Sequence, residues 1–442
     1  MVGSRPASPP APTPRPDTDS PPAPRGVGAP PWGSRRDLRV SIAEGAAYSL
    51  MVGCGETYIP AFALALGLGP VAAGLTASVP VIAGAILQLF APLGRARAGS
   101  NRTWVVTCTI VQALSFAPFV WWALRGHAGL GELLVAASVY WAAGMAGVPA
   151  WTAWIAALVP ARVRTSYFAR RNRLGQFSVF LGFAAGGLAL QEGERRGAVL
   201  VAFAAVFVVA AICRLVSTAL LLACGEPQAQ AGGSEPPAGA AQPVLRRVSA
   251  ALGGMTSRPS GRLVGFLCCF MFGSHVAAPY FTPYMLEELG FSYHAFLLVF
   301  GTAFLAKAIA LPAIGRLASR TGPLGLLGLA AMAIAPLSLL WLPSARIGWL
   351  VVVQVIAGTC WAAYELAVSI LLLDAIGDEE RTGVVTVYNL GLALAMVAGA
   401  GCGGLLLRAC GEDRGAYAAV FGVSCLLRLA ALPLLRGVRL PA

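Results

Sequence analysis

The strongest constraint in this sequence is a series of twelve apolar runs. Each is close to the roughly 20 residues that a helix needs to cross a membrane. They lie at residues 42–66, 72–94, 102–124, 133–158, 174–191, 198–223, 262–286, 294–316, 323–343, 348–373, 384–408 and 416–435. Because lipid offers no partner for free backbone groups, an open chain can cross it only as helices. We therefore predict an all-α integral membrane protein with twelve transmembrane helices.

Composition supports a membrane protein. Only 12% of the 442 residues are charged and the mean hydropathy is +0.73. A soluble domain normally carries about 25% charged residues. The net charge of +13 does not indicate nucleic-acid binding, because the arginines lie in short segments between apolar runs.

Two polar segments divide the chain. Residues 1–36 are rich in Pro, Ala, Arg and Ser and lack the apolar core of a signal peptide, which predicts a disordered cytoplasmic tail. Residues 225–260 are rich in Gly and Pro and predict a cytoplasmic linker. Six apolar runs precede the linker and six follow it. The predicted domains are thus six-helix bundles at 37–224 and 261–442, the second with a short cytoplasmic tail.

The two halves repeat short patterns in the same order. Tyr58-Ile-Pro60 precedes Gly67, as Tyr280-Phe-Thr-Pro283 precedes Gly290. Gly94-Arg95 recurs as Gly315-Arg316, and Arg164-Thr165 recurs as Arg381-Thr382. Internal repeats in membrane-spanning sequence are typical of two-halved transporters. We therefore expect the two bundles to be related by pseudo-symmetry.

Arginine placement orients the chain. If the N-terminus is cytoplasmic, arginines in the cytoplasmic segments outnumber those in the outer segments roughly threefold. We therefore expect a multi-pass protein of the cell (inner) membrane with both termini in the cytoplasm.

These features together resemble the major facilitator superfamily. Its signature loop joins the second and third helices and, again, the eighth and ninth. The second copy is similar to Gly315-Arg316-Leu-Ala-Ser319-Arg320-Thr-Gly322, and the first copy, Gly94-Arg95-Ala-Arg97, is degenerate. Both copies lack the Asp of the family pattern. The resemblance implies alternating access around a central cavity in a monomer, and it indicates no particular solute.

Intramembrane charges carry the functional hypotheses, because an unpaired ionisable side chain in lipid costs several kcal/mol. Glu56 is a candidate protonatable or cation-binding carboxylate in the cavity; the alternative is a structural hydrogen bond. Lys307 could bind an anionic solute or pair with a carboxylate; the alternatives are snorkelling or a structural ion pair.

Further cavity candidates lie in the second half. Trp361, Tyr364 and Glu365 span little more than one helical turn, which suits an aromatic or cationic solute; the alternative is helix packing with a salt bridge at a gate. His275 could relay protons or simply pack.

Other charges predict cytoplasmic contacts. Arg164, Arg170 and Arg171 could form a latch with the acidic residues Asp374, Glu379 and Glu380, in place of the missing signature Asp; the alternative is independent surface charges. We expect Glu44 to pair with loop arginines. Arg214 and Arg428 are expected to snorkel to the interface or to form interdomain pairs.

The sequence predicts a secondary active transporter and not an enzyme. It has no nucleotide-binding Gly-rich motif, no CxxC pair and only three histidines, so we expect no cofactor or metal. The expected partners are the lipid bilayer, a small solute and protons. The first hypothesis is proton-coupled efflux of an amphipathic or aromatic compound. The alternatives are uptake of a nutrient such as a sugar or carboxylate, and a non-transporting scaffold or sensor.

Overall fold

The computed structural model describes residues 34–226, 259–374, 378–411, 413–436 and 438. Most of the predicted tail and linker lies outside these ranges. The described residues form helices and turns and no strand, which confirms the predicted all-α fold. The first half contains α1 (Arg35–Cys54), α2 (Ile59–Ala65), α3 (Gly69–Ala98), α4 (Asn101–Leu114), α5 (Phe116–Arg125), α6 (Leu130–Leu158), α7 (Ala161–Arg195) and α8 (Val199–Ala223).

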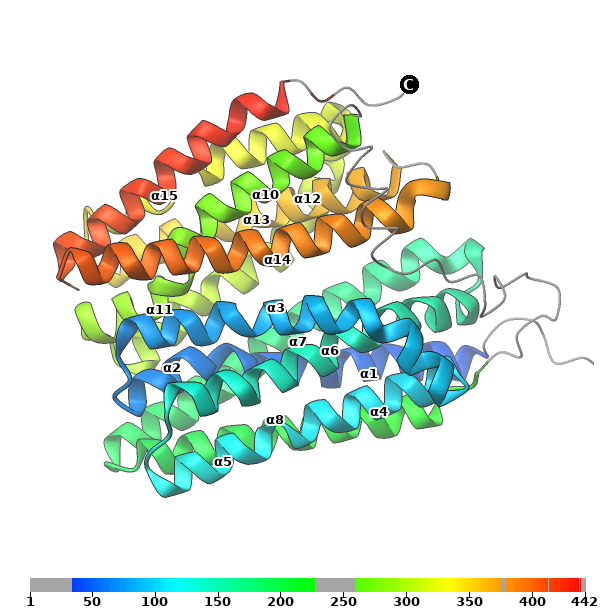
Figure 1. Cartoon of the computed structure of the whole chain (residues 1–442), viewed down its shortest axis with the longest axis horizontal. Helices are drawn as coiled ribbons and strands as arrows, with labels where there is room; N and C mark the ends of the chain where they lie inside the picture. Colours follow the sequence, from blue (N-terminus) through cyan, green and yellow to red (C-terminus); the bar gives the residue numbers. More distant parts are fainter. Residues whose placement is uncertain (1–33, 227–258, 375–377, 412, 437, 439–442) are drawn as a thin grey trace, which may run out of the picture. The chain divides into compact units, whose positions relative to one another are not determined.

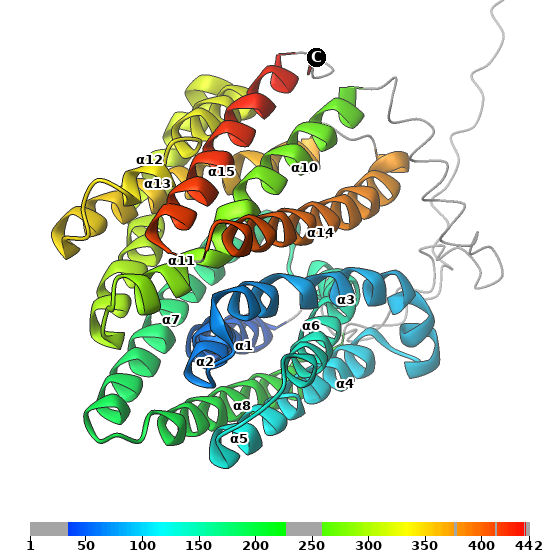
Figure 2. The same cartoon turned by 60° about the vertical axis from the view of Figure 1, so that its left-hand side comes forward.

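The second half contains α10 (Pro259–Ala277), α11 (Phe281–Pro283), α12 (Tyr293–Ile334), α13 (Ile347–Asp374), α14 (Asp378–Ala409) and α15 (Arg414–Leu435). Helices of each half pack mainly on one another. Between the halves, α3 packs on α14 and α7 packs on α12. Figures 1 and 2 show the first half in blue to green and the second half in green to red.

Within the described residues, ten helical stretches are long and apolar enough to cross a membrane. The longest, Tyr293–Trp341, has 49 residues, which is more than twice the length needed to span a bilayer about 30 Å thick. Gly322 interrupts it with a φ of 71° and a ψ of 163°. Because this left-handed φ favours glycine, Gly322 divides the stretch at the border between the predicted eighth and ninth spans. The first predicted span is absent from the ten, and it consists of α1, a short turn and α2.

A polar cap begins α1. The Ser34 side chain accepts a hydrogen bond from the Asp37 backbone N–H, and Asp37 accepts one from the Ser34 N–H at 2.9 Å, which forms a capping box. Asp37 also accepts a hydrogen bond from the N–H of Gly225 at 3.1 Å, which ties the start of α1 to the end of α8. Burial raises the pKa of the Asp37 carboxyl, but these hydrogen bonds outweigh it and hold that pKa below its usual value.

The repeated tyrosines occupy equivalent positions in the two halves. Each ends a single 3₁₀ turn, Glu56–Tyr58 in the first half and Ala278–Tyr280 in the second. The Tyr58 hydroxyl donates a hydrogen bond of 2.6 Å to the carbonyl of Phe183, on α7. The Tyr280 hydroxyl donates one of 2.6 Å to the carbonyl of Ala400, on α14. The sequence pattern that is repeated around Tyr58 and Tyr280 therefore corresponds to a repeated contact between helices.

Glycines allow these helices to approach closely. A Cβ at Gly182 of α7 would overlap the carbonyl oxygen of Leu50 on α1, and a Cβ at Gly399 of α14 would overlap that of Phe272 on α10. Small residues permit such backbone contact between membrane helices. The α1–α7 and α10–α14 pairs are thus built in the same way.

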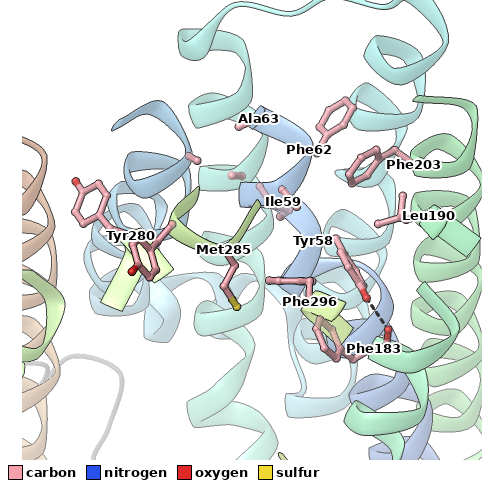
Figure 3. Packing of buried hydrophobic residues seen from close by; sticks show 14 of the residues in the cluster. Tyr58, Ile59, Phe62, Ala63, Phe183, Leu190, Phe203, Tyr280, Met285 and Phe296 are labelled. Carbon is pink, nitrogen blue, oxygen red and sulfur yellow. Dashed lines mark hydrogen bonds between the residues drawn. The ribbon is translucent and has the colours of Figure 1, made fainter. Parts of the chain in front are cut away.

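The same tyrosines lie where the two halves meet. Tyr58 stacks on Phe183 at 5.1 Å between ring centroids and lies 6.2 Å from the ring of Phe296 in the second half (Figure 3). Tyr280 lies against Gly74 of α3. We call the side at which α1 begins and α15 ends the terminal side. The tyrosine contacts lie toward the opposite side, near the turns that connect α2 to α3 and α11 to α12.

Substitution of Gly399 tests the close approach of α10 and α14. Gly399→Ala is expected to destabilise the protein by about 1–3 kcal/mol, because the new methyl group meets the Phe272 carbonyl. Gly401→Ala, two residues along the same helix, is the matched control and should be neutral, because no described residue of another helix lies within 4 Å of the added Cβ. Thermal unfolding in detergent measures both. Equal unfolding temperatures for the two variants would contradict the packing described above.

Candidate functional site

Glu56 lies at the break of the first membrane helix. α1 ends at Cys54, and Glu56 opens the short turn that leads into α2. A Cβ at the intervening Gly55 would lie 2.6 Å from Ala210 and 2.8 Å from Phe116, so the break packs closely against α8 and α5. Although Glu56 lies within a membrane span, its side chain is only half-buried. A half-buried carboxyl at this depth can exchange protons or contact a solute.

Tyr140 holds the Glu56 carboxyl in place. Its hydroxyl, from α6, donates a hydrogen bond of 2.6 Å to Oε2 of Glu56. The Met51 sulfur lies 3.2 Å from the same hydroxyl and is a weaker acceptor. A protonated carboxyl could itself donate, so a change in the protonation of Glu56 alters this contact. The first half thus contains a titratable group linked to a second helix.

Lys307 and Glu365 form an ion pair between α12 and α13. The Lys307 side chain is 20% exposed and that of Glu365 is 53% exposed, so the pair is not enclosed by protein. Lys307 follows Phe300 and Phe304 at helical spacing, and both rings contact Phe183 of the first half, at 6.4 and 5.8 Å between centroids. Lys307 is therefore on the face of α12 that looks toward the first half.

Trp361 and Tyr364 lie beside this pair but differ in exposure. Trp361 is half-buried and meets Tyr364 edge-on at 5.4 Å. Tyr364 is buried and stacks on Phe270 at 5.3 Å. Among the described residues, the Tyr364 hydroxyl has no hydrogen-bond partner. Trp361 and Glu365 are therefore accessible, whereas Tyr364 belongs mainly to the packing of the second half.

His275 is half-buried on α10. Its Nδ1 lies 3.0 Å from the carbonyl of Met271, one turn earlier in the same helix. A Cβ at Gly399 would lie 3.2 Å from the His275 Cβ, so the histidine sits against α14. The described contacts connect it to neither Glu56 nor the Lys307–Glu365 pair.

The residues of the signature loops lie at the terminal side. Gly94 packs under the ring of Trp104, and the Arg95 Nε donates a hydrogen bond of 2.9 Å to Asn101. In the second copy, the side chains are exposed and Gly322 provides the break; the exposed residues are Gly315, Arg316 and Arg320.

The predicted cytoplasmic latch is described only in part. Arg170 is exposed, whereas Arg171 bonds to Glu44 at 2.8 Å within the first half. The remaining side chains of that prediction lie outside the described part of the structure; they are those of Arg164, Asp374, Glu379 and Glu380.

Two arginines correct the sequence-based expectation of snorkelling. Arg214 and Arg428 are 6% and 4% exposed, so neither reaches the interface. Each finds partners within its own half, as buried charges must. The Arg428 guanidinium donates to the carbonyl of Ile334 at 2.9 Å and to the Ser338 hydroxyl at 2.5 Å. The Arg214 Nη1 donates to the Ser217 hydroxyl at 2.9 Å.

Sequence reasoning also missed Tyr140. It lies inside a nearly uninterrupted apolar run, followed by Trp141, and such a pattern is more often packing. A polar hydroxyl near the middle of a span was the one available signal.

Comparison with known proteins agrees with this architecture. The sequence profile of the Major Facilitator Superfamily matches residues 45–399 and 263–441. A search of curated protein sequences gave no significant match. Among solved structures, the nucleoside transporter NupG is similar, with a TM-score of 0.66 and 13% identity over 91% of this chain and 99% of that one.

The xylose transporter XylE from E. coli, in an inward open conformation, has a TM-score of 0.67 and 14% identity over 91% of this chain and 96% of that one. A D-xylose-proton symporter also has a TM-score of 0.67, with 13% identity over 92% and 97% of the two chains. At these identities the likeness concerns the fold alone. Together with the profile match over most of the sequence, it shows that the chain belongs to the Major Facilitator Superfamily.

Proposed function

We propose that the protein is a proton-coupled secondary transporter of small amphipathic or aromatic compounds, with Glu56 as the protonatable group. The half-buried Glu56 carboxyl at the break of α1 carries this proposal. Two residues later, Tyr58 contacts Phe183 in its own half and Phe296 in the other. A change in the protonation of Glu56 therefore occurs next to a contact between the two halves. This contact must open if the halves are to move relative to each other.

Proton binding at Glu56 would be coupled to the conformational change by electrostatics. Closing a site around a carboxylate removes water from its charge, which is costly, whereas the protonated form is neutral. Protonation also changes the bond with Tyr140, because the carboxyl gains a donor. We therefore expect the protonated protein to change conformation more readily than the ionised one.

The proposed solute site lies around Lys307, Glu365 and Trp361. Since Lys307 and Glu365 neutralise each other, the site does not favour a strongly charged anion. The Trp361 ring offers a surface for an aromatic or cationic group. Tyr364 packs edge-on against Trp361. These features favour an amphipathic compound, and we propose its export.

Nutrient uptake is the second candidate. Two transporters with a similar fold, NupG and XylE, are named for polar solutes, a nucleoside and xylose, and this supports a polar nutrient as the alternative solute. Sugar recognition needs several accessible hydrogen-bonding groups. Gln112 and Gln354 are both buried, which leaves fewer amides for such a site. A scaffold or sensor of the same fold would show neither solute movement nor solute-dependent conformational change.

The proposed orientation follows from the arginine asymmetry. With both termini in the cytoplasm, the terminal side faces the cytoplasm. Because Tyr58 and Tyr280 join the halves toward the other side, the structure would then correspond to a form closed to the outside. We propose that this form receives solute from the cytoplasm.

Replacing Glu56 tests proton coupling. In proteoliposomes, an imposed gradient of about one pH unit supplies about 1.4 kcal/mol per coupled proton, so it should change the equilibrium accumulation of a cationic aromatic dye such as ethidium by the native protein about tenfold. Glu56→Gln keeps the size of the side chain but cannot ionise, and it should lose this dependence. The control is Glu192→Gln, whose half-exposed carboxyl pairs with Arg196 at 2.6 Å. An unchanged pH response in Glu56→Gln would remove Glu56 from the mechanism.

A disulfide between the halves tests alternating access. A Cβ at Gly187 would lie 3.1 Å from the Cβ of Leu297, near the spacing of about 3.5–4.5 Å found in disulfides. In a background without the ten native cysteines, oxidising Gly187→Cys/Leu297→Cys should stop dye transport, and reductant should restore it. The single variants report any crowding of Tyr58 by the new cysteine. Full transport by fully cross-linked protein would exclude rocking at this contact.

A further inference from the structure

The first half contains a cavity that the proposed transport site does not use. Its volume is about 210 Å³, and it lies among α1, α4, α6, α7 and α8. The residues that define its chemistry are Glu44, Tyr48, Gly147, Trp151, Arg171 and Arg214. Of the described residues, neither Glu56 nor any residue of the second half lines it. It is therefore separate from the Lys307–Glu365 pair.

Three charged side chains surround this cavity; Glu44 and Arg214 are buried and Arg171 is 11% exposed. Arg171 bonds to Glu44 at 2.8 Å, and the Arg214 Nη1 lies 4.0 Å from the other Glu44 oxygen. That oxygen also accepts a hydrogen bond of 3.0 Å from Ser217. Among the residues that the structure describes, two guanidinium groups thus face one carboxylate, which leaves an excess of one positive charge. Both oxygens of Glu44 are already engaged, so the carboxylate cannot neutralise a second cation fully.

Aromatic rings hold the two guanidinium groups in place. Arg171 lies over the ring of Trp151 at 4.6 Å, and Arg214 lies over that of Tyr48 at 4.8 Å. A Cβ at Gly45 would lie 2.6 Å from the Arg171 guanidinium carbon, so glycine is needed for this placement. Such stacking orients a guanidinium without reducing its charge.

The arginine at the corresponding place in the second half provides a contrast. Arg428 uses all three guanidinium nitrogens in bonds to Ser424, Ile334 and Ser338. Arg214, by contrast, has an Nε that lacks a hydrogen-bond partner among the described residues. Arg428 is thus satisfied by its own bundle, whereas Arg214 is left with unused bonding capacity next to a cavity. Buried polar groups normally find a partner, so the difference indicates that Arg214 has the capacity to bind a ligand.

We propose that this cavity binds a monocarboxylate. A single negative charge matches the excess positive charge, and a carboxylate matches the planar guanidinium fork. The volume is several times the roughly 30 Å³ that one water occupies in the liquid, so a small organic acid fits. Val148, which lines the cavity, is 48% exposed. The cavity therefore opens at the protein surface, and its carboxylate can come from a soluble acid or from the headgroup of a fatty acid in the bilayer.

Ligand-dependent stability of the full-length protein tests this proposal. Unfolding temperature would be measured in detergent against sodium benzoate and against sodium laurate, at constant ionic strength. Benzyl alcohol and dodecanol are the matched uncharged controls. A saturable rise of about 2 °C or more is expected with the acids and not with the alcohols. A rise with both acids indicates a soluble carboxylate, and a rise with laurate alone indicates a lipid one; both outcomes support the site.

Three variants test whether the rise in unfolding temperature comes from binding in this cavity. Arg214→Gln removes the excess charge and should abolish the rise. Gly147→Leu adds no charge but fills the cavity, since a Cβ there already lies 3.4 Å from Cys108, and it should abolish the rise even if Arg214→Gln fails to fold. Arg428→Gln should retain it. The proposal is overturned if neither acid stabilises the native protein, or if the rise survives in Arg214→Gln or Gly147→Leu.

Discussion

Close backbone contact between two pairs of membrane helices underlies the rest of this structure. Gly182 brings α7 against α1, and Gly399 brings α14 against α10. In lipid, a helix break is tolerated only where neighbouring protein satisfies the exposed backbone and side-chain groups. The close approach brings the carbonyls of Phe183 and Ala400 within reach of the tyrosines that follow the two breaks. The breaks can therefore exist within the predicted spans, and each one places a tyrosine between the halves.

The arrangement of charges follows the same requirement. Glu56 has Tyr140, Lys307 has Glu365, and Glu44 has Arg171. Pairing makes burial tolerable but does not remove the ability to respond to a proton or a solute. The Lys307–Glu365 pair is partly exposed, which suits the binding and release of a transported solute. The Glu44–Arg171 pair is packed against the Trp151 ring, which suits a binding site whose geometry stays fixed. This difference separates the proposed transport site from the cavity in the first half.

The features that could be predicted from the sequence are those that apolar runs and internal repeats encode. The apolar runs predicted the helices, and the echo of Tyr58 in Tyr280 predicted equivalent halves. It could not predict side-chain pairs between distant helices, such as Tyr140 with Glu56, because nothing in the spacing within one helix reveals its neighbour. It also misjudged Arg214, since a long basic side chain in a lone apolar helix normally snorkels. Partners on α1 and α8 reverse that outcome, and they become visible only once the helices are packed.

Single-molecule fluorescence transfer between the two halves in nanodiscs tests the central claim most directly, because it requires no known solute. Suitable dye positions, once the other nine native cysteines are replaced, are Gly131→Cys, where an added Cβ meets no neighbouring described residue, and the exposed Cys410; both are distant from the terminal side. The account predicts two separations that exchange, with the population of the longer one changing with pH. That pH response should be absent in Glu56→Gln. A single separation, unchanged by pH and by this substitution, would contradict alternating access controlled by Glu56.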